Sequence, residues 1–335
     1  MKKTFLGIDV GTTSVSGVAV DCEGNCLSTV TMAHAADVDG LPAGVFEQDA
    51  HRLMAVTATV VARLEDECGK PESVGWTGQM HGIVGADADL RPMTNFVTWR
   101  DNRRYGGRVM SDWHSRGITP FMCLPVCALV CHEPVIDETF LHSWYLDEAG
   151  LTFPREWIPS VAEGCMLGDN QAGVYAAQRL FPGSVVVNLG TSGQLSVVRE
   201  CPYEGRAVPG EAAENGSRRE LRPFPGGRTL ECRASMIGGA AWAALREKVQ
   251  MSWEEMNVTD DPRVVSCATR IADDLFDGIE LSGADAVVGV GNALVRNPAL
   301  VRAIEARSGL TCRIPALPEM AACGAAFFAM DRLER

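Results

Sequence analysis

Two short runs of the chain carry residue types that could bind phosphate. The first, residues 7–14, reads GIDVGTTS, and the second, residues 186–193, reads VVNLGTSG. Each run places a glycine and then hydroxyl side chains between two strand-like segments. Superposing the runs pairs Asp9 with Asn188, Gly11 with Gly190, Thr12 with Thr191 and Thr13 with Ser192.

A turn of this composition suits an anionic ligand. Glycine leaves the backbone open to close approach, and backbone N–H groups and hydroxyls donate hydrogen bonds to phosphate oxygens. Neither run is the P-loop that caps a helix, because no Gly-Lys-Ser/Thr sequence follows. One such turn would most often only reverse the chain. The duplication favours two turns that hold one polyphosphate from both sides.

Asp169 offers a carboxylate that could act as a general base. It lies in the run Gly168-Asp169-Asn170-Gln171, before a helix-like segment at residues 174–180. Phosphoryl transfer to an alcohol needs a carboxylate within hydrogen-bonding reach of the hydroxyl. An Asp in this place is equally explained as a helix N-cap. Both interpretations stay open from this run alone.

The N-terminal half contains elements that must position these groups. Alternating apolar residues at 5–20 predict a β-hairpin with the first turn at its tip. Asp49 is a candidate N-cap for a helix that ends at Gly69. A short strand at 74–76 leads into residues 77–82, TGQMHG, where two glycines indicate that something approaches the backbone closely. Prolines interrupt residues 106–163, so we expect short helices and loops there.

The C-terminal half returns to strands around the second turn and then to helices. Strands are predicted at 184–189, 194–198 and 287–290, and surface loops or hairpins at 201–228. Helices are predicted at 239–249, at 264–276, from Pro298 after an Asn297 cap to Gly309, and from about 319 onwards. Small side chains in the last helix predict very close packing.

Composition excludes several classes of protein. The 335 residues, 46% of them hydrophobic and 22% charged, are enough for folded cores and suggest two domains. The net charge of −13 disfavours binding to nucleic acid or to an anionic membrane. We recognise no signal peptide or membrane span and expect a cytoplasmic protein with reduced cysteines. Cys123, Cys127 and Cys131 repeat every four residues in an apolar run, and we assign them no metal.

The order of the motifs along nearly the whole chain resembles that of the FGGY carbohydrate kinases. The matching runs are GIDVGTTS, FEQD at 46–49, TGQMHG, TWRDNR at 98–103, GDNQA at 168–172, NLGTSGQLS at 188–196, RPFPGG at 222–227, GVGNALVRNP at 289–298 and EMAACGAAFFA at 319–329. The GNALVRNP and RPFP runs look most like sedoheptulokinase-type members, and TGQMHG is shared with xylulokinases.

The resemblance implies an α/β fold with two ribonuclease H-like domains of the actin-like ATPase type around an ATP cleft. The domains would be residues 1–180, which bind the sugar and carry the first turn, and residues 181–335, which carry the second turn and bind adenosine. The implied activity is transfer of the γ-phosphate of ATP to a hydroxyl of a ketose or polyol, with Mg²⁺.

The resemblance also implies a role for each matched residue. Asp169 would be the base, and Asp9 would hold Mg²⁺ through water. The nucleotide would be bound by Asp9, Gly11, Thr12, Thr13, Gly190, Thr191, Ser192, Gly239, Gly289 and Gly291. The sugar would be contacted by Gln79, Met80, His81, Trp99, Asp101, Arg103 and Asn170.

The chain also departs from its relatives. The stretches between Arg103 and Asp169 and between Gly239 and Gly289 are shorter than usual for the family, which leaves the sugar and a homodimer undecided. One alternative is a catalytically inactive sensor of nucleotide or sugar. Another is an ATPase of the actin or heat-shock type that acts on protein partners. The carboxylates of Asp9 and Asp169 argue against the sensor, and TGQMHG and TWRDNR favour a small polar substrate.

Overall fold

The computed structural model describes residues 3–80, 82–87, 89, 91–101, 116, 119–122, 167–202, 218–235, 237–281 and 283–333. The chain divides into two compact units. Unit 1 comprises Met1–Ala176 and Leu317–Arg335, and unit 2 comprises Ala177–Ala316. This division differs from the predicted one at the C-terminus, because the last segment belongs to unit 1 rather than to the second domain.

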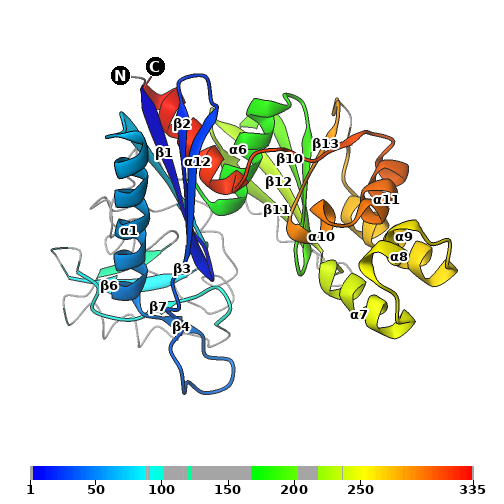
Figure 1. The fold of residues 1–335 in the computed structure, drawn as a ribbon, viewed down its shortest axis with the longest axis horizontal. Helices are drawn as coiled ribbons and strands as arrows, with labels where there is room; N and C mark the ends of the chain where they lie inside the picture. The colour runs from blue at the N-terminus through cyan, green and yellow to red at the C-terminus, as the bar shows by residue number, and fades with distance from the viewer. Residues whose placement is uncertain are drawn as a thin grey trace. The chain divides into compact units, whose positions relative to one another are not determined.

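The main sheet of unit 1 has the strand order β3-β2-β1-β5 (Figure 1). Its strands are β1 Thr4–Val10, β2 Ser14–Asp21, β3 Cys26–Ala33 and β5 Ser73–Gly78. β1 and β2 are antiparallel and pair from Thr4 opposite Asp21 to Val10 opposite Val15, which confirms the predicted hairpin. β5 runs parallel to β1.

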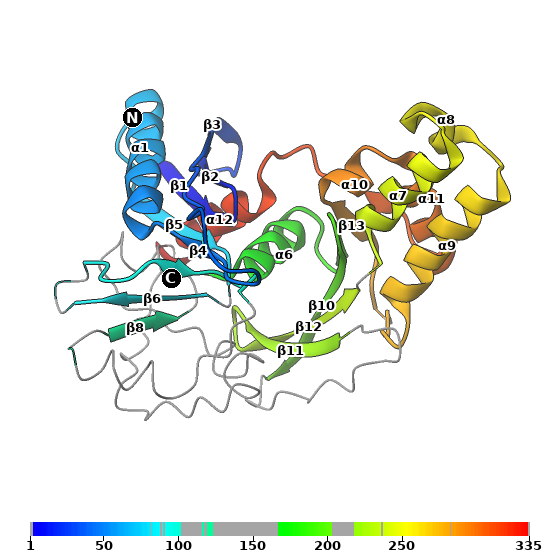
Figure 2. The ribbon, with the colours of Figure 1, turned by 90° about the horizontal axis from the view of Figure 1, so that it is seen from below.

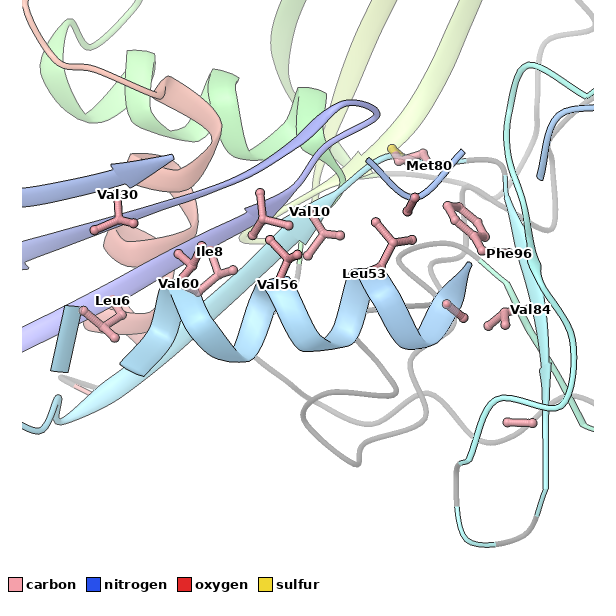
Figure 3. Packing of buried hydrophobic residues seen from close by; sticks show 14 of the residues in the cluster. Leu6, Ile8, Val10, Val30, Leu53, Val56, Val60, Met80, Val84 and Phe96 are labelled. Carbon is pink, nitrogen blue, oxygen red and sulfur yellow. The ribbon is translucent and has the colours of Figure 1, made fainter. Parts of the chain in front are cut away.

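One face of β1 packs against helix α1, Ala50–Cys68. Leu6, Ile8 and Val10 share this face because successive side chains of a strand alternate. Figure 3 shows them opposite the apolar stripe of α1, which includes Leu53, Val56 and Val60. The predicted cap is confirmed, since Asp49 accepts a hydrogen bond from the Arg52 N–H at 3.1 Å.

The other face of β1 lies against helix α12, Met320–Leu333. A Cβ on Gly7 would lie 1.8 Å from the Ala322 carbonyl oxygen, and one on Gly75 would lie 1.9 Å from that of Ala325. The backbones of strand and helix therefore touch, which only glycine in the sheet and small residues in the helix permit. This packing holds the C-terminal segment in unit 1.

Unit 1 contains two further parts. A small sheet has the order β4-β7-β6-β8, with β4 Glu47–Gln48, β6 Ile83–Ala86, β7 Phe96–Val97 and β8 Thr119–Met122. Helix α6, Asp169–Leu180, begins in unit 1 and crosses the boundary. A Cβ on Gly324 of α12 would lie 1.8 Å from the Ala172 carbonyl oxygen, so α6 also meets α12 backbone to backbone.

The sheet of unit 2 repeats the pairing pattern of unit 1. Its order is β11-β12-β10-β9-β13-β14 (Figure 2). The strands are β9 Val185–Leu189, β10 Gly193–Pro202, β11 Arg218–Phe224, β12 Arg228–Ser235, β13 Val287–Val290 and β14 Cys312–Arg313. β9 is antiparallel to β10 and parallel to β13, as β1 is antiparallel to β2 and parallel to β5. The predicted repeat is therefore present in the pairing of the strands as well as in the residues.

Helices surround the core of unit 2. They are α7 Gly239–Val249, α8 Trp253–Val258, α9 Pro262–Phe276, α10 Asn292–Val295 and α11 Pro298–Ser308. α11 starts at Pro298 and ends before Gly309 as predicted. Asn297 precedes it but makes no side-chain cap. Its amide instead donates to the Ala293 carbonyl at 2.6 Å and accepts from the Trp242 indole at 3.1 Å, which ties α7 to α10.

Some sequence predictions fall outside the described residues. These are nearly all of the irregular segment 106–163, with the cysteines at 123, 127 and 131, and residues 203–217. All eight cysteines that the structure describes are free thiols. Among the described residues, no helix is both long and apolar enough to cross a membrane.

Candidate functional site

The first turn joins β1 to β2 through Gly11, Thr12 and Thr13. The Gly11 N–H donates to the Ser14 carbonyl at 3.0 Å and closes the turn. Backbone N–H groups of neighbouring segments bind the carbonyls at the two ends of the turn. That of Gln79 donates to the Val10 carbonyl at 3.0 Å, and that of His34 donates to the Thr13 carbonyl at 3.3 Å.

Two buried glutamines bind the carbonyls within the turn. The Gln79 side-chain amide donates to the Gly11 carbonyl at 3.2 Å. The Gln48 side-chain amide donates to the Thr12 carbonyl at 2.8 Å and to Asp37 at 2.7 Å. The two glutamines are joined to each other, since Gln79 Nε2 donates to Gln48 Oε1 at 2.8 Å.

These bonds set the direction of the donors in the turn. In a trans peptide the C=O and the following N–H point in opposite directions. The Gly11 and Thr12 carbonyls face the buried glutamines, so the N–H groups of Thr12 and Thr13 face away from them. The turn can therefore present two backbone donors and two hydroxyls to an anion, as its sequence suggested.

Asp9 lies on β1, two residues before the turn, and its Oδ1 is buried with no hydrogen-bond partner among the described residues. Its pKa is raised from 3.8 to about 7, mainly by burial and in addition by the negative charges of Asp169 and Glu319. Strand alternation explains its position, because Asp9 shares the α12 face of β1 with Phe5 and Gly7.

Glu319 is a site residue that our sequence interpretation did not assign. It precedes α12 with a positive φ of 44° and accepts a hydrogen bond from the Thr31 hydroxyl at 3.3 Å. A non-glycine residue in this conformation is uncommon. The only sequence signal was its place at the start of the small-residue helix.

Asp169 is the first residue of α6, and its side chain is exposed. Its Oδ1 accepts a hydrogen bond from the Asn170 N–H at 2.7 Å. The preceding Gly168 carbonyl accepts the first helical bond, from Ala172, so Gly168 rather than Asp169 occupies the cap position. The helix terminus stabilises the charged form of Asp169, and the carboxylate remains accessible to a ligand.

The acidic side chains fit indirect binding of a cation. The described residues contain no group of three His, Cys, Asp or Glu side chains that could directly hold one metal ion. Asp9 has an unpaired, buried carboxylate oxygen near two further negative charges. Mg²⁺ usually keeps several of its waters, so contact through water suits this donor set.

Two predicted sugar contacts lie close to these groups. Met80 is buried, and its sulfur would lie 2.3 Å from a Cβ on Gly168, the residue before Asp169. Trp99 is 53% exposed, and its indole N–H donates to the Thr12 hydroxyl at 3.1 Å. Trp99 is therefore not a core residue, and it lies beside the first turn.

The other predicted sugar contacts are placed as follows. Asp101 is buried and accepts a hydrogen bond from the Phe46 N–H at 2.9 Å, which supports the chain before β4. Asn170 is half-buried at the start of α6, and Gln79 faces the first turn. His81 and Arg103 lie outside the described residues.

The second turn, in unit 2, joins β9 to β10 through Gly190, Thr191 and Ser192. The Gly190 N–H donates to the Ser192 carbonyl at 3.0 Å. The start of α7 binds this turn, since the N–H groups of Gly239 and Ala240 donate to the Gly190 and Thr191 carbonyls at 2.9 and 3.0 Å. Thr191 and Ser192 are exposed. Like the first turn, the second is held by its carbonyls.

Packing or backbone conformation within unit 2 explains the glycines that were predicted to bind adenosine. A Cβ on Gly239 would lie 2.3 Å from the Gly190 carbonyl oxygen, so glycine permits the contact of α7 with the turn. A Cβ on Gly289 would meet Leu294 at 2.6 Å and Ile314 at 2.8 Å, which explains this glycine by packing. Gly291 has a φ of +88°. A role of these glycines toward adenosine stays a prediction.

Comparison with known proteins finds carbohydrate kinases among the proteins similar to this chain. Residues 4–122 match the FGGY family of carbohydrate kinases, N-terminal domain. A gluconokinase from Bacillus licheniformis is 24% identical over 106 residues, which cover 32% of this chain and 21% of that protein. A xylulose kinase from Bacillus subtilis is 20% identical over 257 residues, which cover 70% of this chain and 50% of that protein. The chain thus spans half or less of the length of these curated relatives.

The fold is found in solved structures. A gluconate kinase from Lactobacillus acidophilus superposes with a TM-score of 0.74 at 15% identity, over 100% of this chain and 90% of that chain. This likeness confirms the predicted α/β fold, which the chain shares with that kinase. Over residues 4–122 the chain is similar to the N-terminal domain of the FGGY family of carbohydrate kinases, and the curated relatives similar to it are kinases of gluconate and xylulose.

Proposed function

We propose that the protein is an ATP-dependent carbohydrate kinase that phosphorylates a hydroxyl of a ketose or polyol. The observation that carries the proposal is the arrangement at the edge of the unit 1 sheet. A turn with outward-facing donors follows β1, and Asp9, with one buried carboxylate oxygen, lies two residues before it. The exposed Asp169 carboxylate interacts electrostatically with Asp9. A protein that only binds nucleotide has no need of this second carboxylate.

Each group has a part in the transfer. Asp169 would accept the proton of the acceptor hydroxyl as that oxygen forms its bond to the γ-phosphorus. The bond between this phosphorus and the β–γ bridging oxygen breaks, and ADP leaves. The donors of Thr12 and Thr13 in unit 1 would bind phosphate oxygens and stabilise their charge. Within unit 2, Thr191 and Ser192 offer donors of the same kind.

Mg²⁺ would neutralise charge on the β- and γ-phosphates. Asp9 is the residue that would bind its water ligands, because its buried carboxylate oxygen has no hydrogen-bond partner in the part of the chain that the structure describes. A nearby cation would also favour the ionised form of Asp9 over the protonated form. Asp169 remains exposed at the terminus of α6 for the acceptor.

The substrate class is part of the proposal. Met80, Trp99 and Asn170 would contact the acceptor. Met80 packs against Gly168, Trp99 donates a hydrogen bond to Thr12, and Asn170 follows Asp169 in the chain. Relatives include proteins named xylulose kinase, gluconokinase and glycerol kinase, so their substrates define a first panel. Sedoheptulose belongs in it because of the GNALVRNP and RPFP runs.

The test is sugar-dependent release of ADP from Mg-ATP. D-xylulose, sedoheptulose, gluconate and glycerol are offered separately, and the phosphorylated product is identified by mass spectrometry. We expect one polyhydroxylated acceptor to stimulate ADP release and to gain one phosphate. Binding of ATP without stimulation by any acceptor would contradict the kinase and favour a sensor. Stimulation by a protein fraction alone would favour an ATPase with protein partners.

A further inference from the structure

We propose that Gln48 and Gln79 are positioning residues that keep the first turn in its donor-outward conformation. The proposal rests on the proposed function, because it assigns the turn to phosphate. It changes the role of Gln79, which the sequence suggested as a sugar contact, and it gives Gln48 a role that the sequence did not reveal. Neither residue needs to touch a substrate.

The hydrogen bonds fix both amides in one orientation. Gln79 Nε2 donates to two oxygens, the Gly11 carbonyl and Gln48 Oε1. Gln48 Nε2 also donates to two, the Thr12 carbonyl and Asp37 Oδ1. Rotating either amide by 180° would place oxygen against oxygen. The two side chains therefore act as one unit, and each uses both of its donors.

Burial of these two polar side chains has an energetic cost. Gln48 is fully buried and Gln79 is 4% exposed. Gln79 Oε1 has no hydrogen-bond partner among the described residues. An unsatisfied buried acceptor is unfavourable, and apolar side chains of the same size would avoid it. Fixing the two peptide planes of the turn is a function that apolar side chains could not perform.

The network also joins the turn to residues predicted to contact the sugar. Gln79 directly precedes Met80, and its backbone N–H holds the Val10 carbonyl. Asp37 accepts from Gln48 and, at 3.2 Å, from Arg100, which follows Trp99. A shift of the segment that contains Met80 or of the segment that contains Trp99 would therefore displace one of the glutamines and change the orientation of the peptide planes in the turn.

The experiment compares the affinities of the wild type for ATP and for AMP with those of Gln48→Met and Gln79→Met. Methionine has a similar length and fills the space without donating a hydrogen bond. Gln178→Met is the matched control, because Gln178 also donates to a backbone carbonyl, that of Ser184, but belongs to unit 2, whereas the first turn belongs to unit 1. Thermal unfolding of all four proteins is recorded in parallel.

We expect each turn variant to bind ATP about tenfold more weakly, the equivalent of one lost hydrogen bond. The affinity for AMP should change less than twofold, because AMP lacks the phosphates that the turn would hold. The control should keep both affinities. A variant in which ATP and AMP weaken equally, or in which only the melting temperature falls, would show that the glutamines are merely structural and overturn the proposal.

The same experiment separates this proposal from the proposed function. A wild type that binds ATP more tightly than AMP but phosphorylates no sugar contradicts the kinase, while the variants still test the glutamines. A wild type with no preference for ATP over AMP overturns both proposals. Where sugar phosphorylation is detected, the turn variants should lower kcat, with less than a twofold change in KM for the sugar.

Discussion

At the scale of single residues, Asp9 and Asp169 are two carboxylates of one type in contrasting surroundings. Asp9 lies within a strand against α12, with a buried oxygen and two negative neighbours. Asp169 is exposed at a helix N-terminus, where the helix dipole favours the anion. Asp169 is therefore accessible to an acceptor hydroxyl, whereas a positive charge beside the buried oxygen of Asp9 would stabilise that carboxylate.

Asp169→Asn should abolish turnover without abolishing nucleotide binding, because the amide keeps the shape of the side chain but accepts no proton. General-base catalysis contributes about 10²- to 10⁴-fold, so kcat should fall by that factor. Steady-state kinetics and ATP titration measure the two quantities. Asp66→Asn, an exposed position on α1, serves as the control and should match the wild type. Turnover within threefold of the wild type in Asp169→Asn would refute the role.

Asp9 should make the stability of unit 1 depend on pH. Its pKa is about 7 in the folded protein and 3.8 ordinarily, so between these values the folded state holds a proton that the unfolded state has released. The free energy of unfolding therefore falls as the pH rises from about 4 to 7. Asp9→Asn carries no such charge and should exceed the wild type at pH 8 by on the order of 4 kcal/mol at most.

Urea unfolding of the wild type and Asp9→Asn, in EDTA at pH 4, 6 and 8, measures this difference. The two proteins should converge at pH 4, where Asp9 is protonated in the folded state. A constant difference across the three pH values would show that Asp9 is not perturbed by its surroundings.

At the scale of elements, α12 is positioned by contacts between backbones. Gly7 and Gly75 in the sheet, and Gly324 in the helix, each lie where a Cβ would fall within 2 Å of a carbonyl oxygen. Such contacts leave no side chain that could move aside. The face of β1 that carries Asp9 is therefore fixed relative to the start of α12 and Glu319.

Two helical glycines provide a matched test of this packing. Gly324→Ala should destabilise the protein by about 1–3 kcal/mol or more, because the new methyl group would strike the Ala172 carbonyl. Gly173→Ala in α6 meets nothing within 4 Å and should stabilise it by up to about 1 kcal/mol, since alanine favours the helix. Urea unfolding compares them. Equal effects of the two substitutions would argue against backbone contact at α12.

The elements that the sequence predicted well are those governed by local patterns. Alternation predicted β1 and β2, and Asp49 with the apolar spacing predicted α1. Small residues at 321–326 predicted close packing of the last helix. They did not identify the sheet against which it packs, because the sequence of one helix does not specify its tertiary partner.

The candidate site shows the same limit. The two turns could be recognised because each is a short run, whereas Gln48 and Gln79 meet the first turn only after segments far apart in the chain have come together. The resemblance assigns Gly289 to the nucleotide, which stays a prediction, and its packing neighbours Leu294 in α10 and Ile314 after β14 could not be identified from the local sequence. Asn297 stands before a helix as predicted, but its side chain is engaged by Trp242.

At the scale of the whole molecule, unit 2 is inserted between two parts of unit 1. The chain leaves unit 1 within α6 and returns to it at Leu317. α12 then completes the core with Phe5, Val18 and Val20. Unit 2 has a core of its own, built from β9, β10, β13 and the helices α7 to α11.

Removal of residues 317–335 should therefore affect the two units differently. β1, β2 and β5 would lose the helix that covers one face and exchange their amide hydrogens faster, whereas β9, β10 and β13 should keep their protection. Hydrogen exchange with mass spectrometry distinguishes these peptides. Equal loss of protection in both sets of strands would show that the units do not have independent cores.

The return of the chain to unit 1 has a consequence for biosynthesis. A ribosome makes residues 177–316 before it makes α12, so the inserted unit can fold while the sheet around Asp9 still lacks its last helix. Glycine-lined backbone on β1 and β5 is then open to whatever meets the nascent chain first. Slow translation or chaperone capture after residue 316 would prolong this exposure, and the yield of active protein should depend on how quickly the codons for α12 are read.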